Sequence, residues 1–572
     1  MIKRTIAIIV ISACILSVSA DTLNVGNDIS LMGEDNGVIY VSPDGTGDGS
    51  SPDSPLGSTK EALNKSKPGG TIKVLKGIYN GDKHTGLMID RDISIEGDVD
   101  TVFDAEGKNF ILMANGQGLN VNVSNISFRN ANSEHGPAYH GYASVTYLKN
   151  CVFEDNNADT GAGATGFSNA VATLENCTFK RNNAEEFAGA TSSWIGSNVT
   201  LIQCTYENNT VDENGACIFA RGSELTSINS TFKNNNANDS GIIYADQGAK
   251  VSIIKTVFTN NSVEYNGGAI YVLSSNLNVS NSNFTNNHAY NGGAISINSK
   301  SSVNIDSSNF VNNSAEVDGG AVNIKDAQVS ISNSNFTANS AKIRAGVIYN
   351  VGKLSIDNSN FNNNYQTDKS DLYYYGGGVI YNELGDNLII KSSNFTDNKA
   401  VKSGGVLYNV NGTNLTILNS IFTKNSAMFG SAIQNDYGDN LTIKKSIFDG
   451  NLVEGSGAIY IGSAYSSDHD RNVLISDSNF INNVAKNGWG GAIAILSKSN
   501  VNVISSNFDG NTAFRGGAIF LGSASLTISG ASTFTNNFAS YDGGAIDNFD
   551  KGNLDVANDT FFSNNKPNDI GY

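Results

Sequence analysis

Short runs of alternating apolar and polar residues recur along most of the chain. Examples lie at 251–253, 277–279 and 303–305, and each is followed closely by an aromatic residue. Alternation with a period of two is typical of a β-strand that turns one face to a core. After each aromatic residue comes a Gly-rich turn and a second apolar run, as at 267–271 and 516–520. The pattern predicts units of two or three short strands, with no long amphipathic helix between them.

One aromatic residue marks each unit and fixes its length. Fourteen of the sixteen intervals between these residues are 25 to 28 residues long, and the other two are 34 and 32. The aromatic residues are Phe128, Phe153, Phe179, Tyr206, Phe232, Phe258, Phe284, Phe310, Phe336, Phe361, Phe395, Phe422, Phe448, Phe480, Phe508, Phe534 and Phe561. Asn stands three positions after every one of them except Phe128. These asparagines are Asn156, Asn182, Asn209, Asn235, Asn261, Asn287, Asn313, Asn339, Asn364, Asn398, Asn425, Asn451, Asn483, Asn511, Asn537 and Asn564.

A unit this short cannot form a core alone, but stacked copies can. One turn of the chain per repeat places each inward residue above its counterpart, at the strand spacing of about 4.8 Å. The aromatic residues then form a stack, and the asparagines form a ladder of amides at a bend. The sequence therefore predicts an all-β fold, a single-stranded right-handed parallel β-helix of about twenty coils and on the order of 95 Å in length.

The start of the chain has the pattern of an export signal. Lys3 and Arg4 precede an apolar stretch that ends in small residues at Ala20. This arrangement predicts a signal peptide over 1–20 with cleavage after Ala20. An alternative is a lipoprotein signal that would leave Cys14 as the first, lipidated residue. Residues 21–37 are expected to form a flexible segment.

The region 38–110 departs from the repeat and predicts an N-terminal cap with the first coils. Ser58 and Glu61 have the spacing of a capping box, which indicates a short helix. A solenoid needs such a cover because its first coil would otherwise expose strand edges and apolar residues. The repeats are expected over 111–565, followed by a C-terminal tail at 566–572.

Composition narrows the range of partners. The chain has 572 residues and a formal net charge of −18. This charge argues against nucleic acid and against direct binding to anionic lipid, because both are negatively charged. The apolar fraction of 39% argues against wholesale disorder. The chain also contains about eighteen Asn-x-Ser/Thr acceptor motifs for glycosylation, many of which follow from an Asn-rich repeat.

The cysteines fit the same register. Cys151, Cys177 and Cys204 occupy one small-residue position, two before the aromatic residue, in three consecutive coils. Cys217 takes the place of a small residue in a Gly-rich turn. These residues could form a disulfide in an oxidising compartment, or they could be buried thiols in a column that accepts Ser equally well.

An enzyme would need paired carboxylates or a metal cluster. The densest candidate is Asp468, His469 and Asp470, followed by Arg471, which could supply an acid, a base and an anion contact. A solvated loop is the alternative interpretation of this segment. The run from Asp44 to Asp48 has half the pattern of a calcium loop, but a turn explains it as well. We therefore expect no catalytic residue and no cofactor, with Ca²⁺ as the one ion left open.

Insertions in a solenoid form loops that commonly carry recognition. One long coil contains Tyr373, Tyr374 and Tyr375 in a row, and the region 131–147 contains Tyr139 and Tyr142. Tyrosine has a flat apolar ring with a polar tip, which suits sugar rings and protein partners. With Asp468, His469 and Asp470, these are the expected ligand-binding residues. The alternative is that the tyrosines cover a neighbouring coil.

The joint motif of Phe-x-x-Asn and Gly-Gly-Ala followed by Ile, Leu or Val resembles the repeats of chlamydial polymorphic outer-membrane proteins. It is still more similar to adhesin-like proteins of methanogenic archaea, and the segment 40–80 resembles the N-terminal edge of pectin-lyase-like β-helices. The resemblance implies an exported archaeal glycoprotein, secreted or at the cell surface, that mediates adhesion to glycans or proteins of other cells or host surfaces. Two alternatives stay open, a polysaccharide lyase or glycoside hydrolase, and a structural protein of the cell envelope.

Overall fold

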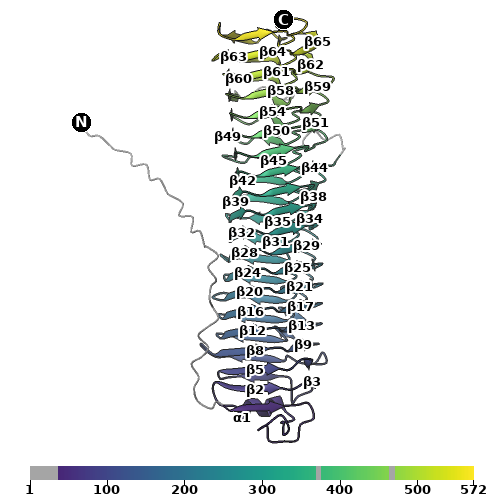
Figure 1. Cartoon of the computed structure of the whole chain (residues 1–572), viewed down its shortest axis with the longest axis vertical. Helices are drawn as coiled ribbons and strands as arrows, with labels where there is room; N and C mark the ends of the chain where they lie inside the picture. The colour runs from purple at the N-terminus through teal and green to yellow at the C-terminus, as the bar shows by residue number, and fades with distance from the viewer. Residues whose placement is uncertain (1–36, 369–374, 463–470) are drawn as a thin grey trace, which may run out of the picture.

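The chain forms a straight rod of stacked coils (Figure 1). The computed structural model describes residues 37–368, 375–462 and 471–572. Among these residues, the strands that carry the aromatic repeat form one parallel ladder of nineteen. At the strand spacing of about 4.8 Å, nineteen coils give a rod of about 90 Å. The predicted parallel β-helix is confirmed.

One coil in the middle of the rod shows the plan. It contains β31 (Ile270–Leu273), β32 (Asn276–Ser280), β33 (Asn283–Thr285) and β34 (His288–Asn291). Each strand pairs in parallel with the same strand of the next coil, which has β35 (Ile295–Asn298), β36 (Ser302–Asp306), β37 (Asn309–Val311) and β38 (Ser314–Asp318). The rod therefore has four ladders of strands along its length.

Residues with positive φ make the bends between the ladders. In one coil these are Ser307 at φ 50°, Asn312 at φ 54° and Gly319 at φ 64°. Asn tolerates this left-handed conformation better than most residues, and Gly adopts it freely. The second Gly of the turn is needed for space, because a Cβ on Gly268 would lie 2.1 Å from the carbonyl oxygen of Gly293. These requirements explain why Asn and Gly recur once or more in each coil.

The interior is built from columns of identical side chains. The ring of Phe310 stacks on Phe284 at 4.6 Å and on Phe336 at 4.7 Å between centroids. At the next bend, the buried amide of Asn313 donates to the side chain of Asn339 and to the carbonyl of Phe284. Its oxygen accepts from both nitrogens of Asn287. The same pattern runs from Asn156 to Asn537, so each buried amide is satisfied by its neighbours.

The last coil differs from the predicted register by one residue. Phe562, not Phe561, stacks on Phe534 at 5.1 Å, and Phe561 is 56% exposed. Asn565 then completes the ladder by accepting from Asn537, while Asn564 has φ 56° and occupies the bend. The prediction of Asn564 as the final ladder residue is therefore wrong. Residues 566–572, expected as a tail, contain β69 (Ile570–Gly571), which pairs with β66 (Ile546–Asn548).

The N-terminal end of the rod has the expected cap. Helix α1 (Thr59–Lys65) begins at Ser58, whose hydroxyl accepts from the backbone N–H of Glu61 at 3.1 Å. Ala62 and Leu63 are buried and join the main core. In Figure 1 the helix lies across the end of the rod that contains β2 (Gly70–Val74). It thus covers the first coils, as the capping argument requires.

The cysteine column consists of buried free thiols. Cys151, Cys177, Cys204 and Cys217 are all buried and none is in a disulfide. The thiols of Cys177 and Cys204 donate to backbone carbonyls of the preceding coil, Leu148 and Leu174. Burial raises the pKa of the Cys217 thiol, which keeps it protonated. The column therefore behaves as packing, in the way that Ser does in neighbouring coils.

Candidate functional site

The strands that follow the Gly-rich turns carry a second aromatic column on their outer side. In β31, Ile270 and Val272 face the core, so Tyr271 between them faces outward. The same register position along the rod carries aromatic residues in eight coils and Ser296, Asn323, Gln434 and Ala494 in four coils between them. The aromatic residues are Phe219, Tyr244, Tyr271, Tyr349, Tyr381, Tyr408, Tyr460 and Phe520. A solvent-facing position is expected to be polar. We call this row of side chains the outer column.

Three arginines organise the outer column into clusters, and the first centres on Arg221. Its guanidinium lies 4.8 Å from the ring of Phe219 and 5.5 Å from that of Trp194. It also donates to both carboxylate oxygens of Asp246, at 2.6 to 3.1 Å. Such a planar, bidentate pair fixes the orientation of the guanidinium over the rings.

The second cluster centres on Arg344 in the middle of the rod. Arg344 donates to the two carboxylate oxygens of Asp318 at 2.7 and 2.8 Å and to Glu383 at 2.9 Å. Its guanidinium lies 4.5 Å from the ring of Tyr349 and 5.6 Å from that of Tyr381. Both rings are buried beneath these charges. This cluster is therefore a small closed core on the outside of the solenoid.

A buried carboxylate adjoins the second cluster and gives it a pH dependence. Asp436 accepts from the hydroxyl of Tyr408 at 2.7 Å and from the amide of Gln434 at 2.8 Å. Burial raises the pKa of Asp436 to about 6, although these hydrogen bonds and the charge of Arg471 favour the ionised form. The pKa in the unfolded chain is about 3.9. The unfolded state therefore binds fewer protons than the folded state between about pH 4 and pH 6.

We expect the stability of the surrounding coils to fall as the pH rises through this window, by about 3 kcal/mol in total. The variant Asp436→Asn keeps an acceptor for Tyr408 and should lose this dependence. Hydrogen exchange of the coils around residue 436, corrected for the intrinsic exchange rate at each pH, measures the difference between the wild type and Asp436→Asn at about pH 4.5 and about pH 7.5. Equal pH slopes for the two proteins would contradict the assignment.

The third cluster lies in the last coils and centres on Arg515. Its guanidinium lies between the rings of Tyr541 and Phe549, 4.8 and 4.4 Å from their centroids. It forms an ion pair with buried Asp547 and lies 3.9 Å from the carboxylate of Asp542. Arg515 itself is largely covered. Its charge is therefore balanced within the cluster.

This third cluster differs from the others because its aromatic rings are open to solvent. The exposed fractions are 39% for Trp489, 43% for Phe514, 62% for Tyr541 and 47% for Phe549. The rings form two groups that Arg515 joins. Trp489 stacks on Phe520 at 4.9 Å and Phe520 contacts Phe549 at 5.8 Å, while Phe514 contacts Tyr541 at 5.5 Å. Arg515 lies over the rings of both Tyr541 and Phe549. We call Trp489, Phe514, Arg515, Tyr541 and Phe549 the C-terminal aromatic patch. Exposed aromatic groups gathered around an arginine are typical of interaction sites.

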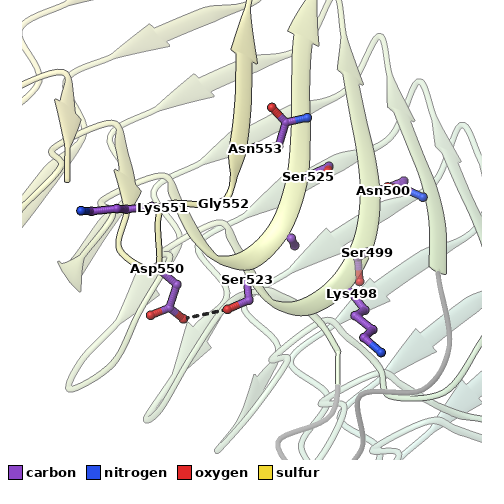
Figure 2. A pocket seen from close by; sticks show the side chains of 10 residues that line it. Lys498, Ser499, Asn500, Ser523, Ser525, Asp550, Lys551, Gly552 and Asn553 are labelled. Atoms are coloured by element: carbon purple, nitrogen blue, oxygen red, sulfur yellow. Dashed lines mark hydrogen bonds between the residues drawn. The ribbon is translucent and has the colours of Figure 1, made fainter.

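A shallow polar hollow adjoins this patch. It has a volume of about 350 Å³ and lies at the corner where β60 (Ile493–Ile504) and β63 (Ile519–Ser529) bend. Figure 2 shows Lys498 and Ser523 on these strands, with Asp550 and Lys551 on the next turn. Asp550 directly follows Phe549 of the patch and accepts from the hydroxyl of Ser523 at 3.5 Å. The hollow thus gathers hydroxyl, amide, ammonium and carboxylate groups at a corner that Asp550 links to Phe549 of the patch.

The structure describes only some of the expected ligand-binding residues. Tyr373, Tyr374, Asp468, His469 and Asp470 lie outside the described residues. Tyr375 is half-buried beside Gly376, which pairs with Arg344 of the second cluster.

Tyr139 and Tyr142, the two candidates in 131–147, lie on opposite faces of β11 (Tyr139–Tyr142). Tyr139 faces inward, is fully buried and hydrogen-bonds Thr146 at 2.8 Å, so its expected role as a ligand contact is wrong. Tyr142, three positions later on the same strand, is 51% exposed and stays a candidate. Arg471, placed with the candidate loop, is fully buried at the start of β57 (Arg471–Ser476).

The sequence did not reveal the aromatic patch because its residues come from three successive repeats, with Trp489 in one, Phe514 and Arg515 in the next, and Tyr541 and Phe549 in the third. Arg515 and Asp547 are 32 residues apart, and Arg221 and Asp246 are 25 apart. These separations are close to one coil, so each pair lies on adjacent rungs. Aligning the repeats and reading the position after Ile in the Gly-Gly-Ala-Ile motif would have revealed the outer column.

The described residues lack both a metal-ligating cluster and a membrane-spanning helix. They contain no group of three or more His, Cys, Asp or Glu side chains that could hold a metal ion. At the loop considered for calcium, Asp48 accepts from Ser50 and from the hydroxyl of Ser54, and these bonds lower its pKa to about 2. Within the same described segments, no helix has the length and apolarity to span a bilayer.

Comparisons with known proteins point to the repeat type. No curated protein sequence matches the chain. Solved β-helices align at low similarity, and at these values the likenesses carry no conclusion about activity. A family 6 alginate lyase, AlyGC, has 12% identity over 93% of this chain and 90% of that chain, with a TM-score of 0.26. Pectate lyase Pel9A has 15% identity over 52% and 78%, with a TM-score of 0.28. PfbA, a surface adhesin of Streptococcus pneumoniae, has 13% identity over 82% and 86%, with a TM-score of 0.19.

A family model for the Chlamydia polymorphic membrane protein repeat matches residues 255–273 and 531–548. The first match covers the start of a coil up to the outer-column residue Tyr271, and the second contains Arg515's partners Asp542 and Asp547. At these two places the chain is similar to the Chlamydia polymorphic membrane protein repeat.

Proposed function

We propose that this protein is exported, displayed at the cell surface or secreted, and mediates adhesion to glycans or proteins of other cells or host surfaces. The observation that carries the proposal is the C-terminal aromatic patch, a group of exposed aromatic rings around Arg515 in the last coils of the rod. Aromatic side chains and arginine are the residues that most often dominate binding energy at recognition surfaces. The polymorphic-membrane-protein repeats and the predicted signal peptide support display outside the cytoplasm.

The rod gives the patch a defined position. Helix α1 caps the N-terminal end of the solenoid, and the patch lies in the last coils, so roughly the whole length of the rod separates the two. A stiff spacer of about 90 Å would hold a recognition surface away from whatever bears the other end. This arrangement suits adhesion better than the turnover of a small soluble substrate.

Two measurements test the proposal. Immunolabelling of intact cells of the source organism should detect the protein at the surface or in the medium, and purified full-length mature chain should bind target cells saturably. Exclusively intracellular protein would contradict export. Release of oligosaccharides from polysaccharides by the purified chain would favour the lyase or hydrolase alternative instead.

A further inference from the structure

We infer that the C-terminal aromatic patch and its adjoining hollow bind an uncharged polysaccharide segment. This inference rests on the proposed adhesive function and specifies the ligand of that site. Two features of the site support the inference of an uncharged ligand. They are the chemistry of the surface and the balance of its charges.

The surface combines the two kinds of contact that a sugar chain needs. A pyranose ring has an apolar C–H face, which packs against an aromatic ring, and a periphery of hydroxyls, which need hydrogen-bond partners. Tyr541 and Trp489 offer large exposed ring surfaces, and each is held in place by a neighbouring ring, Phe514 or Phe520. Rings fixed in this way lose little conformational entropy on binding. The patch can therefore receive successive sugar faces.

The hollow supplies the partners for the hydroxyls. Ser499, Asn500, Ser523, Ser525 and Asn553 line it, so both donors and acceptors are present at its wall. Asp550 lines the hollow and directly follows Phe549 of the patch in the chain, which joins the polar part to the aromatic part. A volume of about 350 Å³ lies within the range of ligand sites. A chain that crosses the patch can place one residue in the hollow.

The charges at the site favour a neutral ligand. Arg515, Lys498 and Lys551 provide three positive charges, and Asp542, Asp547 and Asp550 provide three negative charges, so these six sum to zero. Arg515 is already engaged by Asp547, which leaves it unable to clamp an anion without breaking a buried pair. The whole chain carries −18 and repels polyanions at long range. A polyanionic glycan would therefore meet no net positive surface here.

The other two clusters provide an internal comparison. Phe219, Tyr349 and Tyr381 belong to clusters with the same arginine-and-carboxylate plan, but their rings are buried beneath the charges. They therefore present little surface for a sugar to stack on. Only the third cluster, among those in the described residues, combines open rings with a hollow.

The test measures binding of full-length mature chain to immobilised neutral polysaccharides (β-glucan, mannan, xylan) and anionic ones (alginate, polygalacturonate, heparin). We expect binding to at least one neutral polysaccharide, unchanged between about 0.05 and about 0.5 M salt, because no ion pairing is involved. Tyr541→Ala and Trp489→Ala should each weaken it at least tenfold, the loss typical of a hot-spot side chain. Tyr290→Ala is the matched control, since Tyr290 is 47% exposed and lies outside the patch.

Three results would overturn the inference. The first is binding to anionic polysaccharides alone, with a steep salt dependence. The second is binding to a neutral polysaccharide that neither Tyr541→Ala nor Trp489→Ala weakens. The third is the absence of binding to any of the polysaccharides. Cell adhesion is measured in parallel. It distinguishes failure of the polysaccharide inference from failure of the proposed adhesive function. If the protein still adheres to cells stripped of glycans, it is an adhesin with a protein partner and only the polysaccharide inference fails. If it does not bind untreated target cells at all, the proposed adhesive function and the polysaccharide inference both fail.

Discussion

Replacing Asn313 with Ala is expected to lower the local free energy of unfolding by about 3 to 5 kcal/mol. The Asn313 side chain takes part in four hydrogen bonds of 2.9 to 3.0 Å, two from Asn287, one to Phe284 and one to Asn339. Without this side chain, the backbone N–H and side-chain amide of Asn287 lose an acceptor. The carbonyl of Phe284 and the side-chain oxygen of Asn339 each lose a donor. All of these groups are buried, and each unsatisfied buried group costs about 1 to 3 kcal/mol.

The chain offers a matched control four positions earlier. Asn309 belongs to a second amide ladder, bonded to Asn283 and Asn335 at 2.9 Å, but this ladder is exposed. Water can replace those bonds, so Asn309→Ala should cost less than about 0.5 kcal/mol. Long repeat arrays do not unfold in one step, so hydrogen exchange of the coils over 284–339 is the suitable measurement. Equal protection in the two variants would contradict a structural role for the buried ladder.

Phe310→Ala is expected to cost about 3 to 5 kcal/mol, the usual penalty for removing a buried aromatic ring. The ring is fully buried and stacks on both neighbours at 4.6 and 4.7 Å, so its loss opens a cavity in a continuous column. The strands on either side are fixed by their own ladders and cannot collapse into the space.

The loss at Phe310 should stay near the altered coil, because each coil contacts only its neighbours. Limited proteolysis should therefore find a new cleavage site near residue 310 before the rest of the rod is cut. Tyr265→Ala, at a half-exposed ring, serves as the control and should create no such site. Cleavage spread evenly along the rod in Phe310→Ala would contradict the independent-coil account.

The regular part of the fold could be predicted because every coil repeats the same physical requirements. A buried ring, a bend residue and a buried amide follow one another in fixed order, as in Phe310, Asn312 and Asn313. The order fails where the sequence offers two choices. The last coil has Phe-Phe at 561–562 and Asn-Asn at 564–565, and spacing alone cannot decide between them. The preceding coil decides which phenylalanine continues the interior stack, because the ring of Phe562 lies on that of Phe534.

The candidate site was less predictable, for two physical reasons. Strand parity decides whether a tyrosine faces the core or the solvent, and it placed Tyr139 inside and Tyr142 outside. The aromatic patch is assembled across coils, by contacts such as Arg515 with Tyr541 and Phe549, so no short motif contains it. The candidate loops with Tyr373, Tyr374, Asp468, His469 and Asp470 stay a prediction.

Adhesion of patch variants measures how much of the binding depends on the C-terminal aromatic patch. Beads coated with the full-length mature chain are counted on target cells for the wild type, for the double variant Trp489→Ala/Tyr541→Ala, and for Tyr290→Ala. All three proteins should keep the rod intact, since each altered ring is substantially exposed. We expect the double variant to lose most adhesion and Tyr290→Ala to retain it. Undiminished adhesion by the double variant would contradict the assignment of the C-terminal aromatic patch as the adhesive site.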